Sequence, residues 1–251
     1  MSIALQVALV MVTILVVLLV IGAPIGVAIG MSSAVSMICM IPADVSFATS
    51  AQRIFAGSNS FSLIAIPFFI LAGNIMNNGG IATRLVNCAK VISGRMPGAL
   101  AQSNVVANML FGAISGSGAA AAAAMGGTIG PLEEKEGYDK NYSTAVNVAS
   151  APVGMLIPPS NTMIVYSSVA GSVSIAALFM AGYIPGLLWG GAVMILAGIM
   201  AKKRGYQAEQ RVPVKVALKT FWQAIPSLLL IVIVIGGILG GIFTATEGSA
   251  I

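Results

Sequence analysis

The sequence contains no histidine and two aspartates, and this scarcity excludes several kinds of enzyme. Without histidine, neither Ser–His activation of a nucleophile nor a histidine-ligated catalytic metal is available. Asp44 and Asp139 both fall in expected loops, so they cannot form a catalytic pair within an apolar segment. The pattern Gly116-x-Gly118 follows no strand and lies in no soluble domain, which argues against a nucleotide-binding loop. We therefore do not expect an enzyme.

Charged residues are also scarce: they make up 8% of the chain, while 58% is hydrophobic. A soluble globular protein carries about 25% charged residues, because its surface faces water. Lipid is the usual medium that covers a chain with so few charges. A membrane-crossing helix needs roughly 20 apolar residues, so the length allows about six or seven crossings. The composition predicts an all-α, polytopic membrane protein.

Cysteines and aromatic residues are too few to indicate a metal centre or a nucleic-acid interface. Cys39 and Cys88 lie far apart, without the spacing of a disulfide framework or a metal site. The net charge of +5 could attract phosphate. The basic residues, however, lie in short loops with almost no aromatic residues among them. We expect no nucleic-acid partner and no cofactor.

Long apolar runs predict the ordinary membrane-crossing helices. The first run, Ile3–Ile21, is followed by no signal-peptide cleavage pattern and is expected to be retained. Pro67 lies inside the third run and is expected to kink that helix. Between the runs, Asp44–Gly57 is expected to lie at the membrane surface, and Arg84 to Arg95 to form a polar connection. The second to fifth runs are, in order, Pro24–Met40, Ser60–Asn77, Ser174–Met200 and Phe221–Phe243.

Two further segments are apolar but interrupted. Gly98–Leu132 is broken in its middle by Ser115-Gly116-Ser117-Gly118, so it is either one helix or two short helices that meet at a tip. Asn141–Gly171 contains the pair Pro158-Pro159, which an unbroken helix cannot accommodate. This second segment must therefore be two half-helices with a non-helical link.

The distribution of basic residues favours a re-entrant hairpin over a full crossing for Gly98–Leu132. With a hairpin and an outer N-terminus, eleven of the twelve basic residues face inside and Arg53 alone faces outside, as the positive-inside rule expects. With a full crossing, Lys202 would lie opposite Arg84. The eleven are Arg84, Lys90, Arg95, Lys135, Lys140, Lys202, Lys203, Arg204, Arg211, Lys215 and Lys219.

The two interruptions are the candidate functional site. Irregular backbone at membrane depth is tolerated where it is buried in protein or lines a cavity. Helix ends there expose carbonyl oxygens, which suit a small hard cation, and amides, which suit a carboxylate. Secondary transporters use this arrangement near the middle of the bilayer. The candidate residues are Ser115, Gly116, Ser117 and Gly118 at the tip, and Pro158, Pro159, Ser160, Asn161 and Thr162 at the break.

Several motifs, in order along nearly the whole chain, resemble a known family. They include Ser60 to Gly73 (SFSLIAIPFFILAG), Ile75-Met76, Gly79-Gly80, Ser115-Gly116-Ser117, Gly137-Tyr138-Asp139, Ile157-Pro158-Pro159-Ser160, Tyr166, Leu178 to Gly182 (LFMAG), Pro185-Gly186 and Gly241 to Glu247 (GIFTATE). The family is the large membrane subunit, of DctM type, of the tripartite ATP-independent periplasmic (TRAP) transporters.

The resemblance implies one repeat of an inverted-repeat, elevator-type transporter of the bacterial inner membrane. It implies sodium-coupled uptake of an organic acid such as a C4-dicarboxylate, a sialic acid or a sugar acid. Its partners would be a small membrane subunit and a periplasmic substrate-binding protein. The sodium ligands would be Ser115, Gly116, Ser117, Pro159 and Ser160, and the substrate would meet Gly118, Asn161 and Thr162.

The same resemblance divides the chain into three parts. Residues 1–97 hold scaffold-type helices and the kinked third span. Residues 98–171 hold the moving part, with the hairpin at 98–132 and the broken helix at 141–171. Residues 172–251 hold the following spans and a basic cytoplasmic loop at 201–220.

Two departures from the family pattern affect the expected function. The family commonly has an aspartate soon after the serine tip, where this chain has Ala121. A second inverted repeat is also absent, so we expect a missing second half of the large subunit, from a split gene, a remnant or a truncated record. The alternatives are a non-autonomous assembly subunit and an ion-coupled symporter that needs no binding protein.

Overall fold

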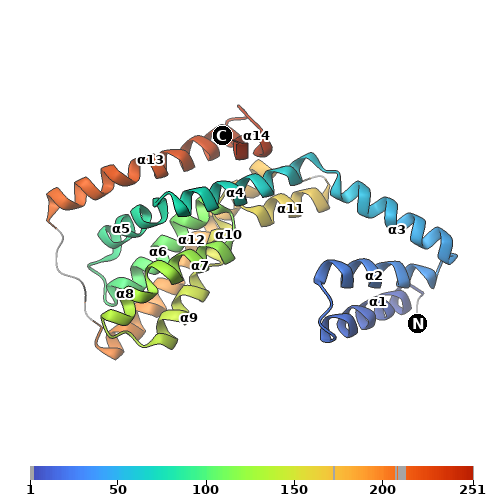
Figure 1. Cartoon of the computed structure of the whole chain (residues 1–251), viewed down its shortest axis with the longest axis horizontal. Helices are drawn as coiled ribbons and strands as arrows, with labels where there is room; N and C mark the ends of the chain where they lie inside the picture. The colour runs from blue at the N-terminus through green and yellow to red at the C-terminus, as the bar shows by residue number, and fades with distance from the viewer. Residues whose placement is uncertain (1–2, 172, 207, 209–212, 251) are drawn as a thin grey trace. The chain divides into compact units, whose positions relative to one another are not determined.

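The computed structural model of the chain describes residues 3–171, 173–206, 208 and 213–250. Every regular element within these residues is a helix, which confirms the all-α prediction (Figure 1). Among the described helices, α1 (Ile3–Val20), α12 (Ile175–Arg204) and α13 (Val214–Leu239) are each long and apolar enough to cross a membrane. The chain divides into two compact units, Met1–Ser60 and Phe61–Ile251.

The first unit contains α1, α2 (Ile25–Ile38) and α3 (Ala43–Ser58), packed in succession. No residue of α1 is buried, as expected for an apolar helix whose surroundings are lipid. The Ser46 hydroxyl donates a 2.7 Å hydrogen bond to the carbonyl oxygen of Ala34 and ties α3 to α2. Asp44 lies in the first turn of α3 rather than in a loop, where its charge complements the helix dipole.

The start of the second unit differs from the sequence prediction at two places. A 3₁₀ turn, Phe61–Ile64, precedes α4 (Ala65–Asn78), so Pro67 lies in the first turn of α4. The predicted kink inside this helix is wrong, because a proline in the first turn removes no intrahelical hydrogen bond. The predicted polar connection is also wrong: residues 81–93 form the amphipathic helix α5 (Ile81–Ser93), which buries Leu85 against α6.

The segment after α5 folds as a helical hairpin. α6 (Ala99–Ser115) ends at the tip, and α7 (Gly118–Thr128) returns beside it, followed by the short α8 (Gly130–Lys135) (Figure 1). Asn147 forms hydrogen bonds with both Asn108 of α6 and Ala122 of α7. Asn108 and Ala122 therefore lie opposite each other across the hairpin. The hairpin is thereby confirmed over the alternative of one continuous helix.

The second interrupted segment is broken as predicted. It consists of α9 (Lys140–Ser150), one turn at α10 (Val153–Leu156) and α11 (Asn161–Ala170). The axis turns by 48° between Lys140–Leu156 and Asn161–Ala170. Pro158 and Pro159 occupy the non-helical link.

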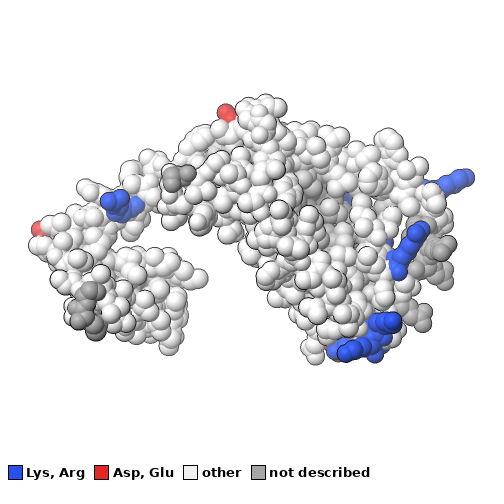
Figure 2. Space-filling view, turned by 180° about the vertical axis from the view of Figure 1, so that it is seen from behind, with Lys and Arg blue, Asp and Glu red and all other residues white. Residues whose placement is uncertain are grey.

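The last helices are α12, α13 and α14 (Ala245–Ala250), and α13 packs on α5. α13 begins before the predicted span, so Lys215 and Lys219 lie on the helix rather than in a loop. Arg211 and most of the predicted loop around it lie outside the described residues. Figure 2 shows Lys and Arg side chains gathered at one end of the second unit, in agreement with the charge asymmetry read from the sequence.

Candidate functional site

The tip of the hairpin is formed by a helix end followed directly by a helix start. Gly116 ends α6 with φ 62° and ψ 13°, a left-handed conformation that favours glycine. Ser117 is extended (φ −134°, ψ 117°), and its hydroxyl oxygen accepts a 3.3 Å hydrogen bond from the amide of Ala120. Ser117 is therefore the N-cap of α7, and the chain reverses within two residues.

The break after α10 has the same construction. Ser160 is extended (φ −131°, ψ 120°), and its hydroxyl oxygen accepts a 3.4 Å hydrogen bond from the amide of Met163. The same hydroxyl donates to the carbonyl oxygen of Met155, one of those left free at the end of α10. Ser160 is completely buried. It caps the N-terminus of α11 and also donates a hydrogen bond to a carbonyl oxygen of α10.

The tip and the break are in direct contact. The amide of Asn161 donates a 3.2 Å hydrogen bond to the carbonyl oxygen of Gly116. The side-chain amide of Asn161 also reaches the carbonyl oxygen of Ser115, at 3.5 Å. A Cβ atom at Gly116 would lie 3.0 Å from the carbonyl oxygen of Pro159. Two segments some 45 residues apart in the sequence therefore form one site.

An unsatisfied oxygen lies at this contact. The side-chain oxygen Oδ1 of Asn161 is buried and has no hydrogen-bond partner among the described residues. The carbonyl oxygens of Ser115, Gly116 and Pro159 are close to Asn161. A group of neutral oxygens without a nearby carboxylate is a set of hard ligands that suits a small cation.

A cavity of about 310 Å³ lies beside the tip. Ser115 and Ser117 line one side of it, and Gly73 and Asn74 of α4 line another. The remaining lining residues are Ile70, Phe111, Ala120, Ala123 and Ala124. Its volume is in the range of small-molecule sites, and its polar side chains are Ser115 and Ser117 of the tip and Asn74 of α4.

The predicted site residues occupy different positions relative to this contact. Ser115, Gly116, Pro159, Ser160 and Asn161 are brought together there, with Ser117 facing the cavity. The other three predicted residues are Gly118, Pro158 and Thr162. Gly118 is buried against the residue that follows α9, where an added Cβ would lie 2.9 Å from the carbonyl oxygen of Ala151. Pro158 is buried in the link, and Thr162 is exposed on the first turn of α11.

A buried polar network behind the tip was not anticipated from the sequence. The amide nitrogen of Asn108 lies within hydrogen-bond distance of Asn104 Oδ1 (2.9 Å), Asn147 Oδ1 (3.0 Å) and Ser150 Oγ (2.8 Å). This network joins α6 to α9, and Asn147 extends it to α7. The signal in the sequence is the spacing of Asn104 and Asn108, four residues apart on one helix face within an apolar run.

The second unexpected feature near the hairpin is the position of Ala121. This residue is fully buried in the apolar cluster shared by α5, α6 and α7, together with Leu85 and Phe111. The side chain at this position therefore faces the interior of the hairpin rather than the cavity.

Comparisons with known proteins agree on one family. The model of the DctM component of the tripartite ATP-independent periplasmic transporters matches residues 12–251. The "Uncharacterized protein YgiK" of Salmonella typhimurium is 54% identical over 220 residues, which are 88% of this chain and 51% of that protein.

Other relatives carry functional names, including two large permease proteins. The C4-dicarboxylate TRAP transporter large permease protein DctM of Rhodobacter capsulatus is 38% identical, over 80% of this chain and 49% of its own length. The sialic acid TRAP transporter large permease protein SiaM of Vibrio cholerae is 40% identical, over 80% of this chain and 47% of its own length. The chain spans about half the length of these relatives. It belongs to the DctM family of TRAP transporter permeases, and it is a multi-pass protein of the inner membrane.

Proposed function

We propose that the chain forms one half of the ion and substrate site in the large permease subunit of a sodium-coupled uptake system for organic acids. The main support is the hydrogen bond from the amide of Asn161 to the carbonyl oxygen of Gly116, which joins two interrupted helices into a single site. Such breaks are where secondary transporters hold their coupling ion and substrate.

Sodium is the coupling ion that fits these residues. The contact offers carbonyl and hydroxyl oxygens together with the unsatisfied Oδ1 of Asn161, and no aspartate or glutamate lies in α6, α7 or α11. A proton carrier needs a titratable group, whereas a hard cation needs only oxygen ligands. In this proposal Ser115, Gly116, Ser117, Pro159 and Ser160 supply sodium ligands.

The substrate is proposed to be an organic acid held at the tip. The names of the relatives specify C4-dicarboxylate, sialic acid and 2,3-diketo-L-gulonate for those proteins, and all three are acids. In this proposal the substrate meets Gly118, Asn161 and Thr162, at the N-termini of α7 and α11, whose positive dipole ends suit a carboxylate.

The moving and fixed parts follow from the same proposal. Residues 98–171 hold the hairpin and the broken helix and would move together with the cargo. The helices within Ile3–Met40 and Phe221–Phe243 would form the scaffold. The partners would be the rest of the large subunit, a small membrane subunit and a periplasmic binding protein.

Serine-to-alanine variants test the sodium site. In the assembled complex in liposomes, Ser117→Ala and Ser160→Ala are expected to raise the sodium concentration for half-maximal uptake by about tenfold, because losing one ligand costs on the order of 1.4 kcal/mol. Each variant also removes a helix N-cap. Ser174→Ala is the matched control, since Ser174 caps α12 in the same way and does not line the tip cavity.

The outcomes separate the rival functions. Unchanged sodium dependence in both variants would contradict the site. Sodium-driven uptake without a binding protein would instead indicate an independent symporter. No uptake by any combination that contains this chain would indicate an assembly subunit without transport of its own.

A further inference from the structure

A buried carboxyl group lies at the base of the hairpin, at the end opposite the tip. Glu133 of α8 is 1% exposed, and its Oε1 atom has no hydrogen-bond partner among the described residues. Charged side chains are almost never fully buried without a partner, because removing the charge from water costs several kcal/mol. The position of this carboxyl therefore calls for an explanation beyond packing.

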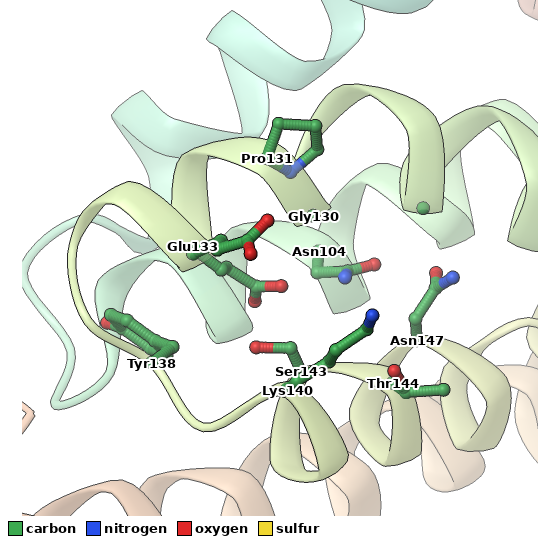
Figure 3. A pocket seen from close by; sticks show the side chains of 11 residues that line it. Asn104, Gly130, Pro131, Glu133, Tyr138, Lys140, Ser143, Thr144 and Asn147 are labelled. Atoms are coloured by element: carbon green, nitrogen blue, oxygen red, sulfur yellow. The ribbon is translucent and has the colours of Figure 1, made fainter.

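Glu133 faces a pocket between α6, α8 and α9 (Figure 3). The pocket has a volume of about 350 Å³, enough for several water molecules. Two further buried polar atoms near it have no hydrogen-bond partner among the described residues, Nδ2 of Asn104 and Oγ of Ser143. Buried donors and acceptors from three helices thus belong to residues that line this pocket.

The titratable groups around Glu133 are few. Glu134, Tyr138 and Lys140 line the same pocket, and Tyr142 of α9 is close enough to respond to the charge of Glu133. α6 and α7 contain no titratable side chain. Lys135 lies on α8 itself and Glu136 follows it, and Arg204 beyond them is paired with Asp139 at 3.1 Å.

Burial has the largest effect on the pKa of the Glu133 carboxyl. It raises the pKa of Glu133 to about 7, against an ordinary value of 4.5, and the neighbouring Ser143 hydroxyl offsets this effect in part. The carboxyl therefore changes charge near neutral pH. Within the described part of the chain, the ionised form has only the Ser143 hydroxyl as a donor to offset its burial, whereas the neutral form can itself donate a hydrogen bond.

We propose that Glu133 is a proton-binding site and that its protonation tightens the packing of α8 on α6 and α9. A metal ion fits the pocket less well, because Asn104 directs an N–H group and Lys140 a cation toward it. Among the described residues, no group of three or more acidic, cysteine or histidine side chains exists that could hold a metal. The site is separate from the tip, so this inference does not depend on the sodium proposal.

Infrared difference spectroscopy of the purified chain in lipid nanodiscs tests the proton site directly. Between about pH 5 and about pH 9, the band of a protonated carboxyl is expected to disappear with a midpoint near 7. Glu133→Gln should remove this step, and Glu134→Gln, a change at the exposed neighbour, should keep it. Ser143→Ala should move the midpoint upward, because the serine hydroxyl stabilises the ionised form.

Thermal unfolding gives a second readout with a defined sign. Because the pKa is higher in the folded chain, the stabilising effect of the proton is complete below about pH 4.5 and is lost as the pH rises through about 7. Glu133→Gln should flatten this dependence. A carboxyl step that survives Glu133→Gln, or a midpoint near the ordinary glutamate value, would overturn the proposal. If Glu133→Gln does not fold, an unchanged midpoint in Ser143→Ala overturns it.

Discussion

Gly116 has a left-handed backbone, with φ 62°, at the point where the hairpin tip meets the broken helix. A side chain there would meet two difficulties at once. The conformation costs a residue with a Cβ about 1–2 kcal/mol, and the Cβ would lie 3.0 Å from the Pro159 carbonyl oxygen and 3.2 Å from the Asn161 amide nitrogen. Both neighbours are backbone atoms, which cannot rotate away.

Gly116→Ala is therefore expected to destabilise the chain by about 2 kcal/mol or more, from the strained conformation and the close contact together. The measurement is thermal unfolding in detergent, compared with Gly127→Ala. Gly127 lies in α7 of the same hairpin but has helical backbone and no heavy atom within 4 Å of an added Cβ. Alanine at Gly127 should be neutral or stabilising. Equal effects of the two changes would contradict the described tip.

At the residue scale, the sequence predicted which residues form the candidate site better than it predicted which residues become buried elsewhere. Ser115 to Gly118 and Pro158 to Thr162 were found because their residue types interrupt apolar runs. Glu133 was not singled out, because its burial depends on how α8 packs against α6 and α9. Long-range packing of this kind leaves no periodic pattern in a six-residue helix.

At the scale of elements, α6 and α10 cross at a pair of glycines. A Cβ at Gly112 would lie 2.1 Å from the Cα of Gly154, so the two backbones touch at this crossing. Close approach of backbones at small residues is typical of helix packing in membranes. The crossing holds the hairpin against the broken helix, one to two turns behind the tip.

Gly112→Ala is expected to force these helices apart and to cost about 3 kcal/mol, the upper part of the usual range for overpacking. It should also lower sodium-dependent uptake in the assembled complex, since the contact between Gly116 and Asn161 depends on the same packing. Gly191→Ala is the matched control in α12, because nothing lies within 4 Å of its added Cβ. A stable, fully active Gly112→Ala variant would contradict the crossing.

Two adjacent prolines predicted a helix break correctly, whereas a single proline led to the prediction of a kink that the structure does not have. Pro158-Pro159 forbids a continuous helix under any packing, so the break was predictable. Pro67 allows either a kink or a helix start, and the 3₁₀ turn before Ala65 decides for the start. The sequence did not predict the amphipathic α5, because the charges of Arg84 and Lys90 are typical of a polar connection. The buried face of the helix around Leu85 is seen only in the structure.

At the scale of the whole molecule, charge alone predicted that Gly98–Leu132 forms a hairpin rather than a full crossing. The described structure shows that α6 and α7 are antiparallel and that most basic side chains of the second unit lie at one end, which Figure 2 shows on one face. In the proposed arrangement both outer ends of this hairpin lie on one side of the membrane. The proposed site between Gly116 and Asn161 would then lie within the bilayer rather than at its surface.

Cysteine labelling from each side of the membrane tests this arrangement most directly. In a chain with Cys39 and Cys88 replaced by serine, single cysteines would be placed at the exposed positions Met96 and Glu136, which flank the hairpin. Lys203→Cys and Arg53→Cys provide the expected inner and outer references. Met96→Cys and Glu136→Cys are both expected to react with a membrane-impermeant reagent from the cytoplasmic side, like Lys203→Cys. Reaction of the two from opposite sides would show that the segment crosses the membrane and would contradict the proposed site.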